Sequence, residues 1–248
     1  MKRWILFVAF FFSLYLMAPA QEKLSPYLGL KSNSTVTNLN TEIQNLLKDN
    51  GYNVIGEYNV AGKADMHVIC FTSDDLIRIC GVFEDRGTLA SVLKIGLRKD
   101  GAQTEISLLN PNYMFYAYFG EDYKIEAPNI KAIDEKIKSV LTTKYGNFTP
   151  FGGALTSNEL EGYHYAVMMP YFEEPVSLEE YKSFEAGLDF IKGKLAGSKD
   201  VKLVYQQINA AKKTAVFGLA LASAEKGEGV FLPIIGERHL AAMPYEII

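Results

Sequence analysis

Two segments show the three- and four-residue spacing of apolar side chains that is typical of amphipathic helices. They are residues 37–52 and 129–146. The apolar positions are Leu39, Ile43, Leu46 and Leu47 in the first segment, and Ile130, Ile133, Ile137, Val140 and Leu141 in the second. Gly51 follows the first pattern, where a glycine commonly ends a helix. Both segments are therefore predicted as helices with one buried face.

The clearest strand signal is an alternation of apolar and other residues. Leu93, Ile95 and Leu97 alternate with Lys94, Gly96 and Arg98, and Ile106 and Leu108 repeat the pattern after Asp100-Gly101. An Asp-Gly pair between two such runs is a strong signal for a β-hairpin turn. Pro111 cannot donate a backbone hydrogen bond to a neighbouring strand, so the second strand should end there.

Weaker patterns complete the predicted elements. Strands are expected near residues 26–31, 53–60, 66–71, 163–171, 201–208, 214–222, 229–235 and 239–247. Residues 74–83, which follow Ser73, fit a short helix or a hairpin strand, and the helix is favoured because Ser73 would cap it. Ser177 and Glu180 resemble a capping box for a helix that runs to about residue 195.

Helices mixed with adjacent strands predict an α+β fold, with antiparallel or mixed sheets and helices packed on one face. Residues 146–162 are rich in Gly, Asn and Thr, which is typical of a connecting segment. The predicted organisation is therefore two-lobed. A first α+β lobe covers residues 21–145, a linker covers 146–162, and a second α+β lobe covers 163–248.

The first twenty residues resemble a secretory signal peptide. Lys2 and Arg3 precede the apolar run 4–17, and Ala18 and Ala20 fit the small residues that precede a cleavage site. The alternative is a retained membrane anchor, but 14 apolar residues are fewer than the roughly 20 that a spanning helix needs. Cleavage after Ala20 would leave residues 21–248, with no stable membrane span, in the periplasm or outside the cell.

Charge and motifs argue against several classes of function. The formal net charge is −4, and removal of Lys2 and Arg3 with the leader takes it to −6. No basic patch of the kind that binds nucleic acid is present, so no nucleic-acid partner is expected. The Gly-x-Ser-x-Gly elbow, the phosphate-binding loop, the dinucleotide glycine motif and His-Glu-x-x-His are also missing. No cofactor is predicted, and an enzyme of unrecognised type stays an alternative.

Cys70 and Cys80 are the only cysteines. In an exported protein an even pair is a candidate disulfide. Because Cys is also among the most buried residue types, two reduced thiols in the core are the alternative. The nine-residue spacer does not fit the Cys-x-x-Cys pattern of a redox site.

Residues 112–123 are dense in aromatic side chains. Tyr113, Phe115, Tyr116 and Phe119 are candidates for a surface that binds a small apolar ligand or a peptide. The alternative is a short amphipathic helix packed on the sheet, because aromatic clusters commonly form core. Exposure of the cluster would support the ligand surface, and burial would exclude it.

Two segments share a loose pattern of His, Ala, Met and Pro-Tyr. His164 and Met168 occur in one, and His239 and Met243 in the other. Thioether and imidazole ligands together suit copper, so a periplasmic copper-type site is an alternative function. If both segments are strands, a four-residue separation spans about 13 Å, too far for one ion. The simpler interpretation is two buried strands that end at Pro170 and Pro244.

The first lobe resembles the family known as domain of unknown function 302. The similarity lies in residues 43–60 and 89–114, where Gly51-Tyr52 follows a helix and Asn110-Pro111 follows a hairpin. It covers roughly residues 30–120. A proline-rich entry to the hairpin is missing before Val92, and the second lobe has no counterpart. The resemblance implies a small α+β sandwich that often self-associates, and it implies no activity.

These observations favour an exported, non-enzymatic binding or interaction module over an enzyme. The expected partner is a small apolar ligand or a peptide. Homo-oligomer formation is an expectation that the family resemblance alone supplies.

Overall fold

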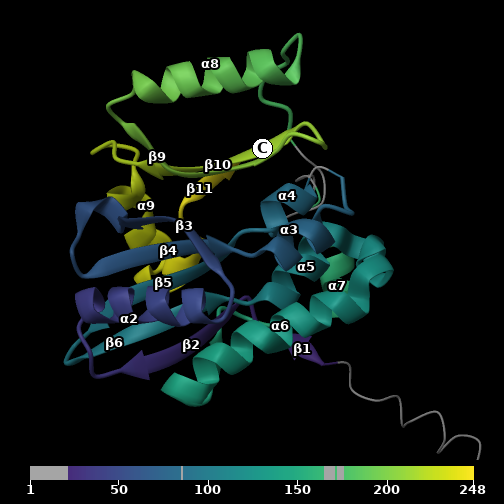
Figure 1. Ribbon diagram of the computed structural model, residues 1–248. Coiled ribbons are helices and arrows are strands. Elements are labelled where there is room, and N and C mark those ends of the chain that lie inside the picture. The colour runs from purple at the N-terminus through teal and green to yellow at the C-terminus, as the bar shows by residue number, and fades with distance from the viewer. Residues whose placement is uncertain (1–21, 85, 165–170, 172–175) are drawn as a thin grey trace, which may run out of the picture.

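The computed structural model describes residues 22–84, 86–164, 171 and 176–248. Helices and antiparallel sheets share one layered arrangement, so the predicted α+β class is confirmed. In Figure 1 the small sheet lies above the large sheet, and helix α8 lies above the small sheet. None of the helices among the described residues has the length and apolar composition needed to cross a membrane.

The large sheet has six strands in the order β3-β4-β5-β6-β2-β7, and every neighbouring pair is antiparallel. Its strands are β2 (Tyr27–Ser32), β3 (Asn53–Asn59), β4 (Met66–Thr72), β5 (Leu93–Asp100), β6 (Gln103–Leu109) and β7 (Thr149–Phe151). β5 and β6 form the predicted hairpin, and Gly101 adopts φ +62° in its turn. The strand predicted near residues 26–31 is present as β2, between β6 and β7.

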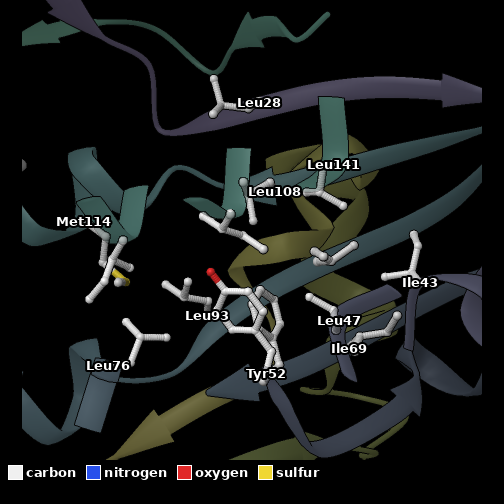
Figure 2. Packing of buried hydrophobic residues seen from close by; sticks show 14 of the residues in the cluster. Leu28, Ile43, Leu47, Tyr52, Ile69, Leu76, Leu93, Leu108, Met114 and Leu141 are labelled. Carbon is white, nitrogen blue, oxygen red and sulfur yellow. The ribbon is translucent and has the colours of Figure 1, made fainter. Parts of the chain in front are cut away.

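One face of the large sheet is covered by helices. They are α2 (Val36–Asp49), α3 (Asp74–Cys80), α4 (Arg86–Ala90), α5 (Pro111–Phe119) and α6 (Tyr123–Tyr145). Leu39, Ile43 and Leu47 of α2 are fully buried, as their spacing predicted. Figure 2 shows Leu47 beside Ile69 of β4, and Ile43, Leu93 and Leu108 belong to the same buried cluster. Ser73 caps α3 by accepting a hydrogen bond from the Leu76 amide, so the predicted helix there is confirmed.

The opposite face of the large sheet packs against residues 201–248, which form the small sheet, α9 (Glu228–Ile235) and η3 (Glu237–Ala242). The small sheet has the order β11-β10-β9, with β9 (Val201–Asn209), β10 (Thr214–Leu221) and β11 (Tyr245–Ile247). An apolar layer between the sheets includes Val68 and Cys70 of β4 and Tyr205 and Val216 of the small sheet. Helix α8 (Phe184–Ala196) covers the outer face of the small sheet.

Two segments predicted as strands are helical. Residues 229–235 fall in α9 (Glu228–Ile235), and residues 239–242 fall in η3 (Glu237–Ala242). The run from Val230 to Ile235 is wholly apolar, and such a short run has no period that separates strand from helix. Gly236, at φ +95°, ends α9 and allows the chain to turn into η3.

Helix α8 begins later than predicted. Ser183 is its N-terminal cap and accepts a hydrogen bond from the Ala186 amide, whereas Ser177 and Glu180 lie in non-helical chain before it. The prediction of a capping box at Ser177 is therefore wrong. The helix ends at Ala196, close to the predicted end near residue 195, and Gly197 is its C-terminal cap.

The segment predicted as a linker is structured. Residues 146–162 contain β7, which pairs with β2, and β8 (Leu155–Thr156), which pairs with β1 (Lys23–Leu24). They also contain α7 (Ser157–Glu161), capped by Thr156 and packed near α5. Of the strand predicted at 163–171, residues 165–170 lie outside the described residues.

Candidate binding cleft

A cleft of about 540 Å³ lies where an edge of the large sheet meets an edge of the small sheet. Residues of β3 and β9 form its walls. The end of β10 and the start of α9 close it at one end. Figure 1 labels these four elements. The lining residues are Glu57, Tyr58, Asn59, Ala61, Gly62, Lys202, Leu203, Val204, Ala220, Leu221, Ala222, Ser223, Ala224, Glu228 and Gly229. A volume of this size is within the range of ordinary small-molecule sites.

Two irregular strand positions bring the walls together. The pairing of β3 with β4 shifts between Val54 and Gly56, and the pairing of β9 with β10 shifts at Gly218/Leu219, opposite Val204. A Cβ atom at Gly56 would lie 2.4 Å from the Val204 carbonyl oxygen. Only a residue without a side chain allows β3 and β9 to approach this closely.

Glu228 forms the closed end of the cleft. This first residue of α9 is 1% exposed. Its Oε1 accepts hydrogen bonds from the Tyr58 hydroxyl (2.8 Å) and the Leu221 amide (3.3 Å), and its Oε2 accepts from the Ala61 amide (3.1 Å). Burial, followed by the charge of Glu228, raises the pKa of Tyr58, which therefore stays a protonated donor. One carboxylate thus joins β3, the turn after it, β10 and α9.

Glu57 of β3 pairs with Ile69, so its side chain lies on the face of the large sheet that packs on α2, away from β9. Its Oε2 accepts hydrogen bonds from Asn40 Nδ2 (2.8 Å) and Gln44 Nε2 (2.6 Å) of α2, and lies 3.1 Å from His67 Nε2. The other ring nitrogen of His67 lies 2.7 Å from Asn59 Oδ1. The Glu57 side chain is 44% exposed, whereas that of His67 is 11% exposed. Asn40, Gln44 and His67 therefore fix Oε2 of Glu57. The imidazole of His67 contacts both Glu57 and Asn59 of β3.

The Glu57 carboxylate contributes no acceptor to the cleft, because it lies on the α2 side of β3. Within the part of the chain that the structure describes, no hydrogen bond reaches Glu57 Oε1. The rest of the lining is mainly apolar: Leu203 and Val204 of β9 with Ala220, Leu221 and Ala222 at the end of β10. A cleft with an apolar floor and a few oriented polar groups is suited to binding a small molecule.

A second polar cluster lies between the sheets and is closed to solvent. Lys94 Nζ of β5 is 2.5 Å from Glu246 Oε2 of β11, and the two side chains are 4% and 11% exposed. The Tyr205 hydroxyl donates to Glu246 Oε1. Burial, then the charge of Glu246, raises the pKa of Tyr205. Because these groups satisfy one another in the interior, the cluster supports the fold and offers no open position to a ligand.

Cys70 and Cys80 are both free and buried. Cys70 faces the layer between the sheets, and Cys80 of α3 faces the helical side of the large sheet. The structure thus has the second of the two alternatives drawn from the sequence, reduced core thiols. Burial raises the pKa of both thiols, so neither resembles an activated nucleophile.

The aromatic residues of α5 do not form an exposed ligand surface. Phe115 and Phe119 are 0% and 5% exposed, and Phe119 stacks on Phe83 with ring centroids 3.7 Å apart. Tyr113 and Tyr116 are half-buried, and Tyr116 stacks on Tyr123. The prediction of an apolar ligand surface here is corrected, because these rings complete the core between α5, α6 and the sheet.

The predicted metal ligands lie in different surroundings. His239 packs against Tyr27 and Phe151, and its Nδ1 lies 3.2 Å from the Gly236 carbonyl oxygen. Met243 is buried in the layer between the sheets. His164 has an edge contact with Tyr171, and Met168 lies outside the described residues, so that pair stays a prediction. Among the described residues, no three His, Cys, Asp or Glu side chains converge as a metal site would require.

The sequence analysis missed the cleft residues. Glu57 and Glu228 are 171 positions apart, and neither belongs to a motif. Gly56 inside a predicted strand was the one local signal, since an isolated glycine in a strand pattern often marks a bulge or a close approach of another backbone.

Comparisons with known proteins show no family for this chain. No family model matches it, and no curated protein is significantly similar to it. One solved structure with partial likeness is an uncharacterised conserved protein DUF302 from Bacillus stearothermophilus. It is 13% identical, with a TM-score of 0.41, over 47% of this chain and 95% of that chain. This likeness concerns part of the fold, and nothing about function follows from it.

Proposed function

We propose that the protein is exported and acts as a non-enzymatic binding protein whose ligand occupies the cleft between β3 and β9. The observation that carries the proposal is the construction of the cleft. It has about 540 Å³ of space, an apolar floor, and two polar side chains, Tyr58 and Glu228, fixed by hydrogen bonds at its closed end. Fixed groups bind a ligand with a smaller loss of entropy than mobile ones.

The hydrogen bonds of Tyr58, Glu228 and Ser223 favour a binding site over a catalytic site. Tyr58 and Glu228 hold each other, and Glu228 also receives two backbone amides. The Ser223 hydroxyl oxygen accepts hydrogen bonds from the amides of Glu225 and Lys226, as in a turn. A nucleophile would need an adjacent base, and these contacts serve structure instead.

A large side chain placed in the cleft tests whether a ligand binds there. Ala222 lies on the exposed rim, so Ala222→Trp should fold and reduce the space for a ligand. Ala211→Trp, in the exposed turn after β9, is the matched control. Native mass spectrometry of protein purified from its source should show a retained small molecule in the wild type and in Ala211→Trp, but not in Ala222→Trp. An adduct that survives Ala222→Trp would place the ligand elsewhere, and a bare chain in the wild type would count against a tightly held ligand.

Export rests on the leader sequence alone. The same mass measurement tests it, because cleavage after Ala20 predicts a mature chain that begins at Gln21. A chain that retains Trp4–Met17 in a membrane fraction would support the alternative of a membrane anchor.

A further inference from the structure

We infer that the cleft selects a ligand that carries a carboxylate on an aliphatic body, with the Lys202 ammonium group as the partner of the carboxylate. This inference rests on the proposed binding function and adds the chemical class of the ligand. The carboxylate belongs either to a free aliphatic acid or to the C-terminus of a peptide.

The strand register places the Lys202 side chain on the cleft side of the small sheet. Gly218 of β10 pairs with Tyr205, which belongs to the layer between the two sheets, so this face of β10 is directed toward the large sheet. Ala220 lies two residues further along β10 and therefore on the same face. The pairing shift leaves its extra residue, Val204, on β9, so the alternation along β10 is unbroken. Lys202 pairs with Ala220, and since directly paired residues have their side chains on one face, Lys202 faces the cleft that both residues line.

Lys202 is also the charged residue of the lining that is left without a partner. Among the described residues, its ammonium group takes part in no hydrogen bond and no ion pair. Glu57 is directed toward α2, outside the cleft. The Glu228 carboxylate opposes an anionic ligand, but the Tyr58 hydroxyl and two backbone amides already surround it, and their dipoles offset part of its field.

The Ser223 hydroxyl supplies a second donor in the lining. Its oxygen accepts hydrogen bonds from the amides of Glu225 and Lys226, which occupy both of its lone pairs. The hydroxyl hydrogen has no acceptor among the residues that the structure describes, and it remains for a ligand. An ammonium group and a hydroxyl hydrogen both require an acceptor, and a carboxylate supplies acceptors only, with the added strength of charge-assisted hydrogen bonds.

The surroundings of Lys202 are small and apolar. Ala220 lies opposite Lys202, and Ala222 follows two residues later, where its amide donates to the Asp200 carbonyl oxygen. Alanine side chains fill little space, which leaves room in the cleft beside the lysine. An aliphatic body placed here would cover the alanines and Val204 and remove them from water. The free ammonium group and this apolar lining together match an amphipathic acid.

The experiment compares three probes with the same aliphatic body: hexanoate, n-hexanol and n-hexylammonium. Affinities come from NMR titrations of cleft amides in the full protein at about pH 7, where a carboxylic acid is ionised. Hexanoate should bind most tightly and hexylammonium most weakly. The reverse order would show that a negative charge selects the ligand, and it would overturn the inference.

Lys202→Gln identifies the group that selects the charge. It should weaken hexanoate about tenfold and leave hexanol unchanged, because it removes the ammonium charge from a position that is exposed and unpaired. Lys202→Arg keeps the charge and should bind hexanoate within a few-fold of the wild type. Lys212→Gln, in the exposed turn after β9, removes the same charge outside the cleft and is the matched control. A hexanoate affinity that is equal in Lys202→Gln and Lys212→Gln would overturn the assignment to Lys202.

The outcomes also separate the inference from the function on which it rests. Hexanol that binds as tightly as hexanoate, and is blocked by Ala222→Trp, overturns the carboxylate preference and leaves the cleft as a binding site. Failure of all three probes to shift the cleft amides overturns the inference, whereas the binding function is judged separately by the molecule retained in native mass spectrometry.

N-acetyl-trileucine and its C-terminal amide distinguish the two sources of the carboxylate. A peptide that binds more tightly than hexanoate, and loses its affinity on amidation, assigns the carboxylate to a peptide C-terminus. Tighter binding of hexanoate assigns it to a free aliphatic acid. A peptide amide that binds as tightly as the free peptide and more tightly than hexanoate would overturn the carboxylate preference.

Discussion

Lys94 of the large sheet and Glu246 of the last strand form an ion pair that is nearly excluded from solvent, with 2.5 Å between Nζ and Oε2. This contact joins β5 to β11 and so fixes the small sheet against the large one. Because β9 of the small sheet forms one wall of the cleft, the pair also supports the cleft from a distance.

Lys94→Met should lower the free energy of unfolding by about 3–5 kcal/mol, because Glu246 would remain buried without its cation. Lys94→Met combined with Glu246→Gln should recover at least half of that loss, since the glutamine is neutral and can still accept from Tyr205. Urea unfolding followed by circular dichroism measures both. A double variant as unstable as the single one would show that the pair is not the source of the effect.

Gly56→Ala should lower the free energy of unfolding by about 1–3 kcal/mol, because the new Cβ would meet the Val204 carbonyl oxygen at 2.4 Å and push β3 from β9. Gly193→Ala is the control, because this helical glycine of α8 has open space around its Cβ position and should gain up to about 1 kcal/mol. Thermal unfolding of the two variants compares them. Equal stability of Gly56→Ala and the wild type would mean that the close approach does not hold.

Glu105 provides a pH dependence with a definite sign. Burial raises its pKa, but hydrogen bonds and charges from Arg238 and Arg98 more than offset this, so the pKa lies below its usual value. The stabilisation is therefore present above the unfolded pKa of about 4.3 and is lost as the pH falls through the lower folded pKa. Glu105→Gln should cost about 2 kcal/mol or more at pH 7.

The same variant should differ less from the wild type at pH 3 than at pH 7 when both are unfolded in urea. Glu135→Gln, an exposed position of α6, should show no such trend. A constant difference between Glu105→Gln and the wild type across this range would contradict the lowered pKa.

The two cysteines should be unreactive in the folded protein. Both thiols are buried and their pKa values are raised by burial, so a thiol reagent such as Ellman's should not modify them at pH 8. After denaturation the same reagent should detect two thiols per chain. Detection of none in the denatured protein without reductant would show that Cys70 and Cys80 are joined by a disulfide.

Local patterns predicted the first part of the fold well. The stripe through Leu39, Ile43 and Leu47 and the Asp100-Gly101 turn specify their elements through short-range geometry, which sequence periodicity records directly. The run from Val230 to Ile235 has no polar residue to reveal a period, and its helical form depends on the contacts of Glu228 and on Gly236.

The cleft was beyond sequence reasoning for a different reason. It exists only where β3 (Asn53–Asn59) and β9 (Val201–Asn209) meet. These two strands are far apart in the chain, and only the stacking of the two sheets brings them together. The prediction of a ligand surface at Phe115 and Phe119 was wrong for a related reason. Composition shows that a segment is apolar, but only tertiary packing decides whether it is covered.

The most direct test of the proposed cleft is native mass spectrometry of the wild type and Ala222→Trp, each purified from its source. We expect a retained small molecule on the wild type and none on Ala222→Trp, because the indole would fill the space beside β9. A small molecule that survives Ala222→Trp, or a wild type that carries none, would contradict the account.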